Sequence, residues 1–283
     1  MAKFCSLAEA VSENLRDGNS VAMEGFTHLI PFAAGHEVIR QGIKNLALIR
    51  MTPDLIYDQL IGVGLAEKLV FSWAGNPGIG SLHRMRDAVE NGWPKPLTIE
   101  EHSHAAMANA FDAGAANLPF AVFRGYIGVD LPKVNKTIRQ VTCPYTGEVL
   151  ATVPALRPDV AIIHAQRADR AGNVLIEGIL GVQKEAVLAA KRSIVTVEEV
   201  VEDFGTRSPN AVILPAWTIT AIAIVPGGAY PSYAHGYYKR ANGFYKAWDA
   251  ISRDRDSFTA WIRENVLNKS PADFKTYQTT AAA

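Results

Sequence analysis

The sequence predicts an α/β fold in which a mostly parallel sheet is flanked by helices, with a helical extension at the C-terminus. Short apolar runs bounded by turn residues recur along the chain, as the buried strands of a parallel sheet do. Amphipathic helical patterns alternate with these runs, which is typical of strand–helix–strand units. Because no Gly/Ser linker divides the chain, we expect one α/β domain over residues 1–232. The remaining residues, 233–283, should form helices that pack on this domain or on a partner.

The first half of the chain predicts helices and strands in alternation. Ser6 and Glu9 have the spacing of a capping box, so a helix should begin after Ser6 and run to about Arg16. Asp54 is expected to cap a helix, and Ser81 is expected to begin another. The other expected helices are 33–42 and 103–116, and the expected strands are 20–23, 46–51, 68–73 and 97–101.

The second half of the chain begins with a change of pattern. Residues 136–153 are strand-like and are broken by turn residues. We expect the final residues, 276–283, to be a frayed end. The strands expected after residue 153 are 159–166, 172–179, 193–200, 211–215 and 219–232, and the expected helices are 183–191, 238–250 and 257–266.

Charge and cysteine content limit the classes of function. The 28 basic residues balance 28 acidic ones, so electrostatics give no reason to expect nucleic acid or an anionic membrane as a partner. No stretch approaches the ~20 continuous apolar residues of a membrane span, and the N-terminal residues lack the apolar region of a secretory signal. Cys5 and Cys143 lie far apart, without metal-ligand spacing, which favours reduced thiols in a cytoplasmic protein.

A glycine-rich turn, "GNPGIGS", follows the expected strand 68–73. The backbone amides near Gly75, Asn76 and Gly78, together with the start of the next helix, could hold a phosphate or a carboxylate. The spacing is not that of a dinucleotide fingerprint, and the turn lacks the lysine of a P-loop. On glycine spacing alone, a tight turn between strand and helix is the favoured interpretation.

The densest cluster of ionisable residues is "EEHSH", residues 100–104, at the end of an expected strand. The spacing does not match a helical metal site, so we predict no metal. Glu101 beside His102 could do acid–base chemistry, or the cluster could shape a pocket that faces a partner. The structural alternative is a helix cap at Ser103 with acidic residues near the positive helix end.

The stretch "SVAMEGFTHLIP" ends an apolar run in a carboxylate, Glu24, followed by glycine. Such a glutamate could be a nucleophile, or it could fix a loop beside a nucleophile from elsewhere. His28, Arg50 and Ser72 also lie at or just past expected strand ends, which are neighbours in a parallel sheet, so they could converge. Arg50 should meet a carboxylate, either of the chain or of a substrate. For each of these three residues, a structural ion pair or polar cap is the alternative.

Several motifs in order along nearly the whole chain resemble the A (alpha) subunits of class I coenzyme A transferases. The likeness is closest to the longer A subunits of bacterial aromatic degradation, because the chain continues well past Pro231. The motifs are "AMEGFTHLIP", "RMTPDLIYDQLIG", "FSWAGNPGIGSLHRMRDAVE", "EEHSHA", "IIHAQRADRAGNV", "GILGVQKEA", "VTVEEVV" and "VPGGAYPSYAHGYY".

This resemblance implies an α/β subunit of an A2B2 heterotetramer that needs no metal or organic cofactor. It implies transfer of CoA from succinyl-CoA to 3-oxoadipate in the beta-ketoadipate pathway, through a glutamyl-CoA thioester, with ping-pong kinetics. The nucleophilic glutamate of such enzymes lies in a Ser-Glu-Asn-Gly motif of the B subunit. This chain has no such motif, since "SENL" at 12–15 lies in the first expected helix and has leucine in place of glycine.

The resemblance also assigns expected roles to residues of this chain. Gly25 and Phe26 match the Gly-Gly-Phe loop of A subunits, with Glu24 in place of its first glycine, so Glu24 should anchor the loop rather than attack. His28 and Arg50 are the cations expected to hold the distal carboxylate of the substrate. Five further residues are expected to contact the substrate carboxylate or CoA, namely Ser72, Gly75, Asn76, Gly78 and His102.

Two other functions stay open at this stage. One is an acyl-CoA hydrolase or ring-cleaving relative in which Glu101 of this chain is catalytic. Such an enzyme would turn over a CoA thioester without an acceptor acid. The other is a non-catalytic ligand-binding regulator. That alternative has no support, because the sequence shows neither a helix-turn-helix pattern nor a basic patch.

Overall fold

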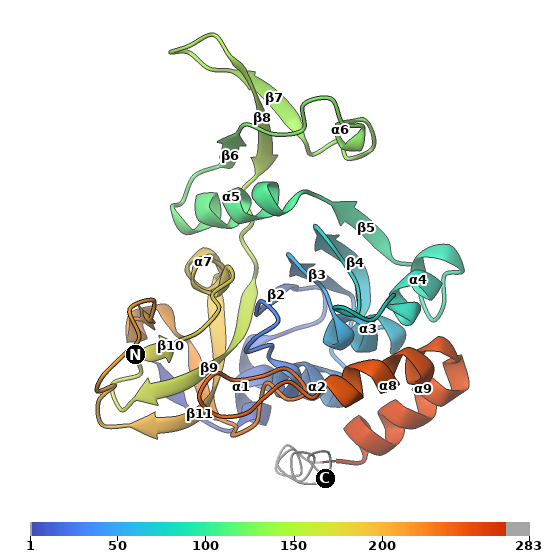
Figure 1. Cartoon of the computed structure of the whole chain (residues 1–283), viewed down its shortest axis with the longest axis vertical. Coiled ribbons are helices and arrows are strands. Elements are labelled where there is room, and N and C mark those ends of the chain that lie inside the picture. Colours follow the sequence, from blue (N-terminus) through green and yellow to red (C-terminus); the bar gives the residue numbers. More distant parts are fainter. Residues whose placement is uncertain (1, 270–283) are drawn as a thin grey trace.

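The computed structural model describes residues 2–269 and contains one large, mainly parallel sheet. Neighbouring strands along the main path of this sheet are parallel, which confirms the predicted fold class (Figure 1). In order across the sheet, the strands are β1 (Lys3–Phe4), β13 (Ala221–Ile224), β11 (Arg192–Val201), β9 (Val160–Asp169), β2 (Ser20–Glu24), β3 (Leu46–Arg50), β4 (Ala66–Phe71) and β5 (Thr98–Glu101). Two short antiparallel strands, β10 (Val174–Ile176) and β12 (Val212–Leu214), join it beside the end of β9.

Helices cover both faces of this sheet. On one face lie α1 (Leu7–Asn14), α2 (Phe32–Gln41) and α3 (Leu55–Gly62), and on the other lie α5 (His104–Ala115) and α7 (Gln183–Ala189). Successive residues of β9 enter the two cores alternately, with Ile162 in the first and Ile163 in the second. A strand buried on both faces reads as a continuous apolar run, as β9 does from Val160 to Ile163, and its later buried polar residues, His164 and Gln166, are hydrogen-bonded.

The local signals in the first half of the chain place most helix ends to within two residues. Ser6 and Glu9 form the predicted capping box, and Ser103 caps α5 by accepting from the amide of Ala106. Asp54 lies at the start of α3, but its carboxylate pairs with Arg50. The predicted start at Ser81 is wrong, because α4 (His83–Glu90) begins two residues later.

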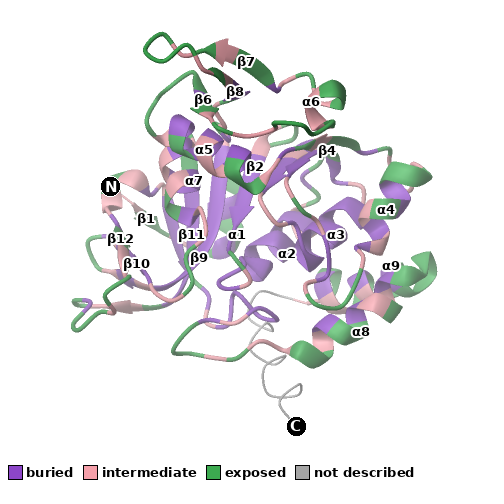
Figure 2. Cartoon of the chain, turned by 45° about the horizontal axis from the view of Figure 1, so that its top comes forward, coloured by how far each residue is buried: buried purple, intermediate pink, exposed green. Residues whose placement is uncertain are grey.

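An arm of the chain extends beyond α5 as a separate antiparallel sheet (Figure 1). It consists of β6 (Phe120–Phe123), β7 (Arg139–Thr142) and β8 (Val149–Pro154), with the short helix α6 (Leu131–Val134) in the connection. The strand-like pattern over 136–153 is confirmed by β7 and β8, whereas β6, α6 and the separation of this sheet were not predicted. Much of the arm is exposed, in contrast to the buried strands of the main sheet (Figure 2).

Two helices close the described part of the chain, α8 (Asn242–Arg253) and α9 (Arg255–Ile262), followed by one π-helical segment (Arg263–Leu267). Helix α8 begins four residues later than predicted because the preceding segment folds back on itself, with a bridge between Ala234 and Tyr238. The predicted frayed end at 276–283 lies outside the described residues. None of the helices in the described range has the length and apolarity needed to cross a membrane.

Helix α8 is held to the domain by a buried tryptophan. The indole Nε1 of Trp248 donates to Asp58 at 3.0 Å, and its ring packs edge-on against Trp261 and Phe258. Nearby, the guanidinium of Arg255 bonds both carboxylate oxygens of Asp87, at 2.7 and 2.8 Å. These contacts attach α8 and α9 to the helices α3 and α4.

We predict that Trp248→Ala lowers the free energy of unfolding by about 3–5 kcal/mol, because it leaves a large cavity and removes a donor from the buried Asp58. Urea unfolding at neutral pH measures the change. Trp217→Ala is the control, since that side chain is 78% exposed and its loss should cost less than about 0.5 kcal/mol. A Trp248→Ala loss as small as that of the control would contradict this account of the extension.

Candidate active site

The loops that follow four adjacent strands meet at one edge of the sheet. β2, β3, β4 and β5 are consecutive and parallel, so their carboxyl ends lie side by side, where open α/β sheets hold ligands. A pocket of about 230 Å³ opens there. Its lining residues are Phe26, Thr27, Arg50, Thr52, Asp54, Trp73, Pro77 and His104.

The loop over residues 25–29, which follows β2, has a strained backbone. Thr27 and Leu29 take positive φ angles of 56° and 52°, which non-glycine residues rarely adopt. A Cβ atom on Gly25 would lie 2.8 Å from the carbonyl oxygens of both His28 and Leu29, so a side chain there would collide with the loop's own backbone. Such a conformation persists only where the surroundings fix it.

Hydrogen bonds from distant segments fix this loop. The guanidinium of Arg50 donates to the carbonyl of Gly25 at 2.8 Å. From the other side, the hydroxyl of Ser232 donates to the carbonyl of Thr27 at 3.1 Å, and the amide of Leu29 donates to the carbonyl of Tyr233 at 2.9 Å.

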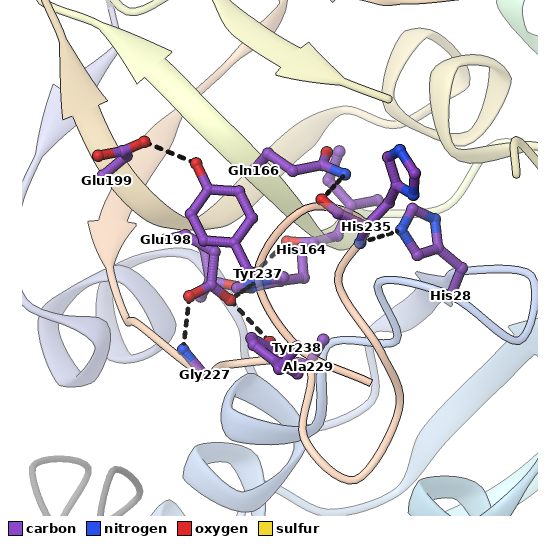
Figure 3. Close-up of polar contacts among 12 residues, drawn as sticks. His28, His164, Gln166, Glu198, Glu199, Gly227, Ala229, His235, Tyr237 and Tyr238 are labelled. Atoms are coloured by element: carbon purple, nitrogen blue, oxygen red, sulfur yellow. Dashed lines mark hydrogen bonds and ion pairs between the residues drawn. The ribbon is translucent and has the colours of Figure 1, made fainter. Parts of the chain in front are cut away.

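His28 is a neutral anchor of this loop and not the expected cation. Its Nε2 accepts from the amide of His235 at 2.9 Å, so Nε2 carries no proton, and Nδ1 lies 3.2 Å from the carbonyl of Ile179 (Figure 3). Burial lowers the pKa of this imidazole to about 4. The prediction that His28 supplies a positive charge is therefore corrected, because its two nitrogens are already used to tie the 25–29 loop to other segments.

Arg50 lies at the inner wall of the pocket as a buried cation whose charge is already compensated. Its Nη1 donates to Asp54 at 3.0 Å, and both side chains are almost fully buried. The expected carboxylate partner of Arg50 thus comes from the chain itself. Within residues 2–269, the Nε of Arg50 and the Oδ2 of Asp54 have no hydrogen-bond partner.

Glu24 ends β2 beneath the same loop. Its carboxylate accepts from the amide of Met51 at 3.2 Å, and the side chain is buried. Burial raises the pKa of Glu24 to about 7, which the nearby Arg50 and the backbone donors offset only in part. A buried carboxylate bonded to a neighbouring strand end has the geometry of a loop anchor.

The 25–29 loop also presents backbone donors that are not in use. In the described residues, the amides of Phe26 and Thr27 donate to no acceptor, and the strand pairing ends just before them, at Glu24 and Ile163. Both residues line the pocket, and Phe26 is 38% exposed. Adjacent free amides beside an apolar ring can stabilise an oxyanion that forms on a bound acyl group.

Other residues expected at the site are engaged in bonds within the chain. The hydroxyl of Ser72 donates to the carbonyl of Met51 at 2.7 Å, and the amide group of Asn76 donates to the carbonyl of Tyr245 at 2.7 Å. Gly75 packs under the ring of Trp73, and Gly78 lies exposed at a positive φ of 77°. The "GNPGIGS" segment therefore serves as a turn that supports the pocket wall.

The "EEHSH" cluster divides between two places. His102 is buried and its Nε2 lies 2.9 Å from Glu100, which also pairs with Lys68 at 2.6 Å. Glu101 is exposed and lines a different pocket from Phe26, together with Glu100 and Lys68. His104, in contrast, faces the pocket of the 25–29 loop. Within the described chain, no group of three or more His, Cys, Asp or Glu side chains is arranged to hold a metal ion.

Six of the eight residues that line the pocket were not predicted as site residues, namely Thr27, Thr52, Asp54, Trp73, Pro77 and His104. Among them, Thr52 and Trp73 lie two residues past the ends of β3 and β4, as Phe26 does past β2, and His104 lies three residues past the end of β5. Collecting the residues two or three positions past each expected strand end, rather than the ionisable residues alone, would have found them.

Comparisons with known proteins give a consistent result. Residues 4–224 match the family model described as coenzyme A transferase. The chain is 62% identical over 282 residues to the A subunit of 3-oxoadipate CoA-transferase from Pseudomonas knackmussii, covering 100% of this chain and 99% of that protein. It is 31% identical over 292 residues to the A subunit of glutaconate CoA-transferase from Acidaminococcus fermentans, covering 96% and 90%. The crystal structure of glutaconate coenzyme A-transferase from that organism matches with a TM-score of 0.90 at 30% identity, over 99% of this chain and 94% of the other.

The raised pKa of Glu24 predicts a pH-dependent effect of Glu24→Gln on stability. The carboxyl has a pKa of about 7 when folded and an ordinary value near 4.5 when unfolded. The folded state therefore binds more protons between these values, and the stability of the parent falls as the pH rises from about 4.5 to 7. Glutamine does not titrate. The unfolding free energy of Glu24→Gln, relative to that of the parent, should therefore rise by about 2 kcal/mol between pH 5 and pH 8.

Urea unfolding of the parent and of Glu24→Gln at the two pH values measures this shift. At pH 5 both side chains are largely neutral in the folded protein, so the comparison at this pH mainly reports the effect of the amide on packing. A difference that does not change with pH would contradict a buried Glu24 with a raised pKa.

Proposed function

Because the chain belongs to the coenzyme A transferase family, we propose that it is the A subunit of a 3-oxoadipate CoA-transferase, which moves CoA from succinyl-CoA to 3-oxoadipate in the beta-ketoadipate pathway. The observation that carries the proposal is the 62% identity along the entire chain to the 3-oxoadipate enzyme subunit of Pseudomonas knackmussii. The twofold lower identity to the glutaconate enzyme subunit favours 3-oxoadipate over glutaconate as the acceptor.

In this proposal, a glutamate of a B subunit supplies the nucleophile. Its carboxylate attacks the thioester carbonyl of succinyl-CoA and forms a mixed anhydride with release of the CoA thiolate. The thiolate then attacks the glutamyl carbonyl, which releases succinate and leaves a glutamyl-CoA thioester. The same steps in reverse order, with 3-oxoadipate as the acceptor, produce 3-oxoadipyl-CoA and restore the glutamate. The reaction thus needs no cofactor beyond the CoA thioester itself.

This chain would contribute the surroundings of the acyl group. Each attack on a carbonyl carbon places negative charge on its oxygen, and the free amides of Phe26 and Thr27 are suited to donate hydrogen bonds to that oxygen. The ring of Phe26 beside Trp73 would exclude water from the anhydride, which water would otherwise hydrolyse. Arg50 would keep the loop in place through the carbonyl of Gly25.

The arrangement of partners follows from the same proposal. A chain that holds the acyl group but lacks the nucleophile needs a B subunit to complete the site, and we propose an A2B2 heterotetramer in the cytoplasm. The two free cysteines, Cys5 and Cys143, fit a reducing compartment. The alternative of a hydrolase with Glu101 as its base gains no support, because Glu101 lies on a separate pocket.

We predict that CoA transfer needs both subunits and an acceptor acid. This chain, the B subunit and their mixture would each be assayed with succinyl-CoA, with and without 3-oxoadipate. Only the mixture with 3-oxoadipate should form 3-oxoadipyl-CoA, because neither subunit alone has both the nucleophile and the oxyanion donors. Glutaconate in place of 3-oxoadipate is the specificity control. Turnover of succinyl-CoA by this chain alone, or release of free CoA without an acceptor, would contradict the proposal.

A further inference from the structure

A buried carboxylate on β11, Glu198, lies outside the pocket and binds three donors. Its Oε1 accepts from Nε2 of His164 and from the hydroxyl of Tyr238, each at 2.7 Å, and its Oε2 accepts from the amide of Gly227 at 2.7 Å (Figure 3). Glu198 is only 6% exposed. Two of its three donors belong to one stretch of chain, residues 226–238, which we call the clamp segment.

The clamp segment runs from these anchors to the 25–29 loop. Past Gly227, Ser232 and Tyr233 bond the backbone of Thr27 and Leu29. The amide of His235 then donates to His28, as Figure 3 shows. The segment returns to Glu198 through Tyr238. It is therefore fixed to Glu198 near both ends and holds the strained loop in between.

The fit between the clamp segment and the sheet is tight. A Cβ atom on Gly228 would lie 2.8 Å from the ring of His164, so the backbone at this point rests directly on the imidazole. The hydroxyl of Tyr238 also accepts from the amide of Ala229 at 3.1 Å, which closes the segment on itself. A small shift of the Glu198 carboxylate would therefore move the backbone that holds the loop.

We propose that Glu198 and Tyr238 are positioning residues that set the geometry of the 25–29 loop through the clamp segment. They touch neither the pocket nor the reacting atoms. Their effect on the reaction would be indirect, through the placement of the Phe26 and Thr27 amides. The inference rests on the proposed function, in which these amides stabilise the oxyanion.

The charge state of Glu198 agrees with this role. Burial acts to raise its pKa, but the bonds from His164, Tyr238 and Gly227 outweigh burial and hold the pKa of Glu198 below its usual range. The group is thus an ionised acceptor at neutral pH. Three donors require such an acceptor, whereas a glutamine would turn its amide N–H groups toward one of them.

The chain offers a matched control for each variant. Tyr237 and Glu199 are the sequence neighbours of Tyr238 and Glu198, and they form the same kind of bond, with the Tyr237 hydroxyl donating to Glu199 at 2.6 Å. That pair lies on the exposed side of β11. Tyr237→Phe and Glu199→Gln therefore remove the same atoms as Tyr238→Phe and Glu198→Gln, but from a water-exposed bond, which stabilises a structure less than a buried one.

The first measurement is steady-state CoA transfer in the complex with the B subunit. We expect Tyr238→Phe to lower kcat by about 10-fold or more, with the KM for succinyl-CoA within about twofold of the parent, because a misplaced loop affects charge developed during reaction more than binding. Tyr237→Phe should retain the kcat of the parent. Thermal unfolding of both variants checks that the fold is intact. If Tyr238→Phe has the same kcat as Tyr237→Phe, the proposal is overturned.

The second measurement is amide hydrogen exchange in peptides that cover residues 25–31 of this chain, which needs no activity. Tyr238→Phe and Glu198→Gln should speed exchange at Leu29 at least about 10-fold, and the two controls should leave it unchanged.

Slower turnover without faster exchange would overturn the route through the clamp segment, as would faster exchange without slower turnover. If Glu198→Gln fails to fold, Tyr238→Phe decides. A parent complex inactive with 3-oxoadipate would count against the proposed function, while the exchange experiment would still test the anchoring.

Discussion

The conformation of the 25–29 loop is the constraint on which the candidate site depends. Gly25 has no room for a side chain, and Thr27 and Leu29 take left-handed backbone angles that cost about 1–2 kcal/mol each. Without outside support, the loop would relax to a conformation with its amides elsewhere. Its bonds to Arg50, Ser232, Tyr233 and His235 therefore determine where the free amides lie.

The charged and polar side chains around this loop hold its backbone and are poorly suited to attack a substrate. Arg50 is bonded to the carboxylate of Asp54 and to the carbonyl of Gly25, and its charge offsets the effect of burial on the pKa of Glu24 only in part. Burial leaves Glu24 with a raised pKa, which makes it a poor candidate for a standing nucleophilic carboxylate. His28, neutral and bonded on both nitrogens, likewise serves the backbone. These polar side chains fix the conformation of the 25–29 loop, and we expect the reacting carboxylate to come from the partner subunit.

The fold was more predictable than the site, for physical reasons that particular residues illustrate. The first half of β9 is buried on both faces and is a continuous apolar run, and the capping box at Ser6 and Glu9 is a local pattern, so both are visible in the sequence. Whether His28 meets a substrate or a backbone amide depends on His235, more than 200 residues away. No local pattern reports such a contact. The separation of the arm as its own sheet was missed for a similar reason, since nothing local in β6 shows that it pairs with β8 instead of the main sheet.

We propose that this chain shapes the site while the B subunit carries the nucleophile. The most direct test is to incubate the complex of both subunits with succinyl-CoA, reduce the thioester with borohydride and locate the modified glutamate by mass spectrometry. We expect modification only on the B subunit, at the same level in the parent and in complexes made with Glu24→Gln or Glu101→Gln. Modification of any residue of this chain, or its loss from the B subunit in either variant with the complex still assembled, would contradict the account.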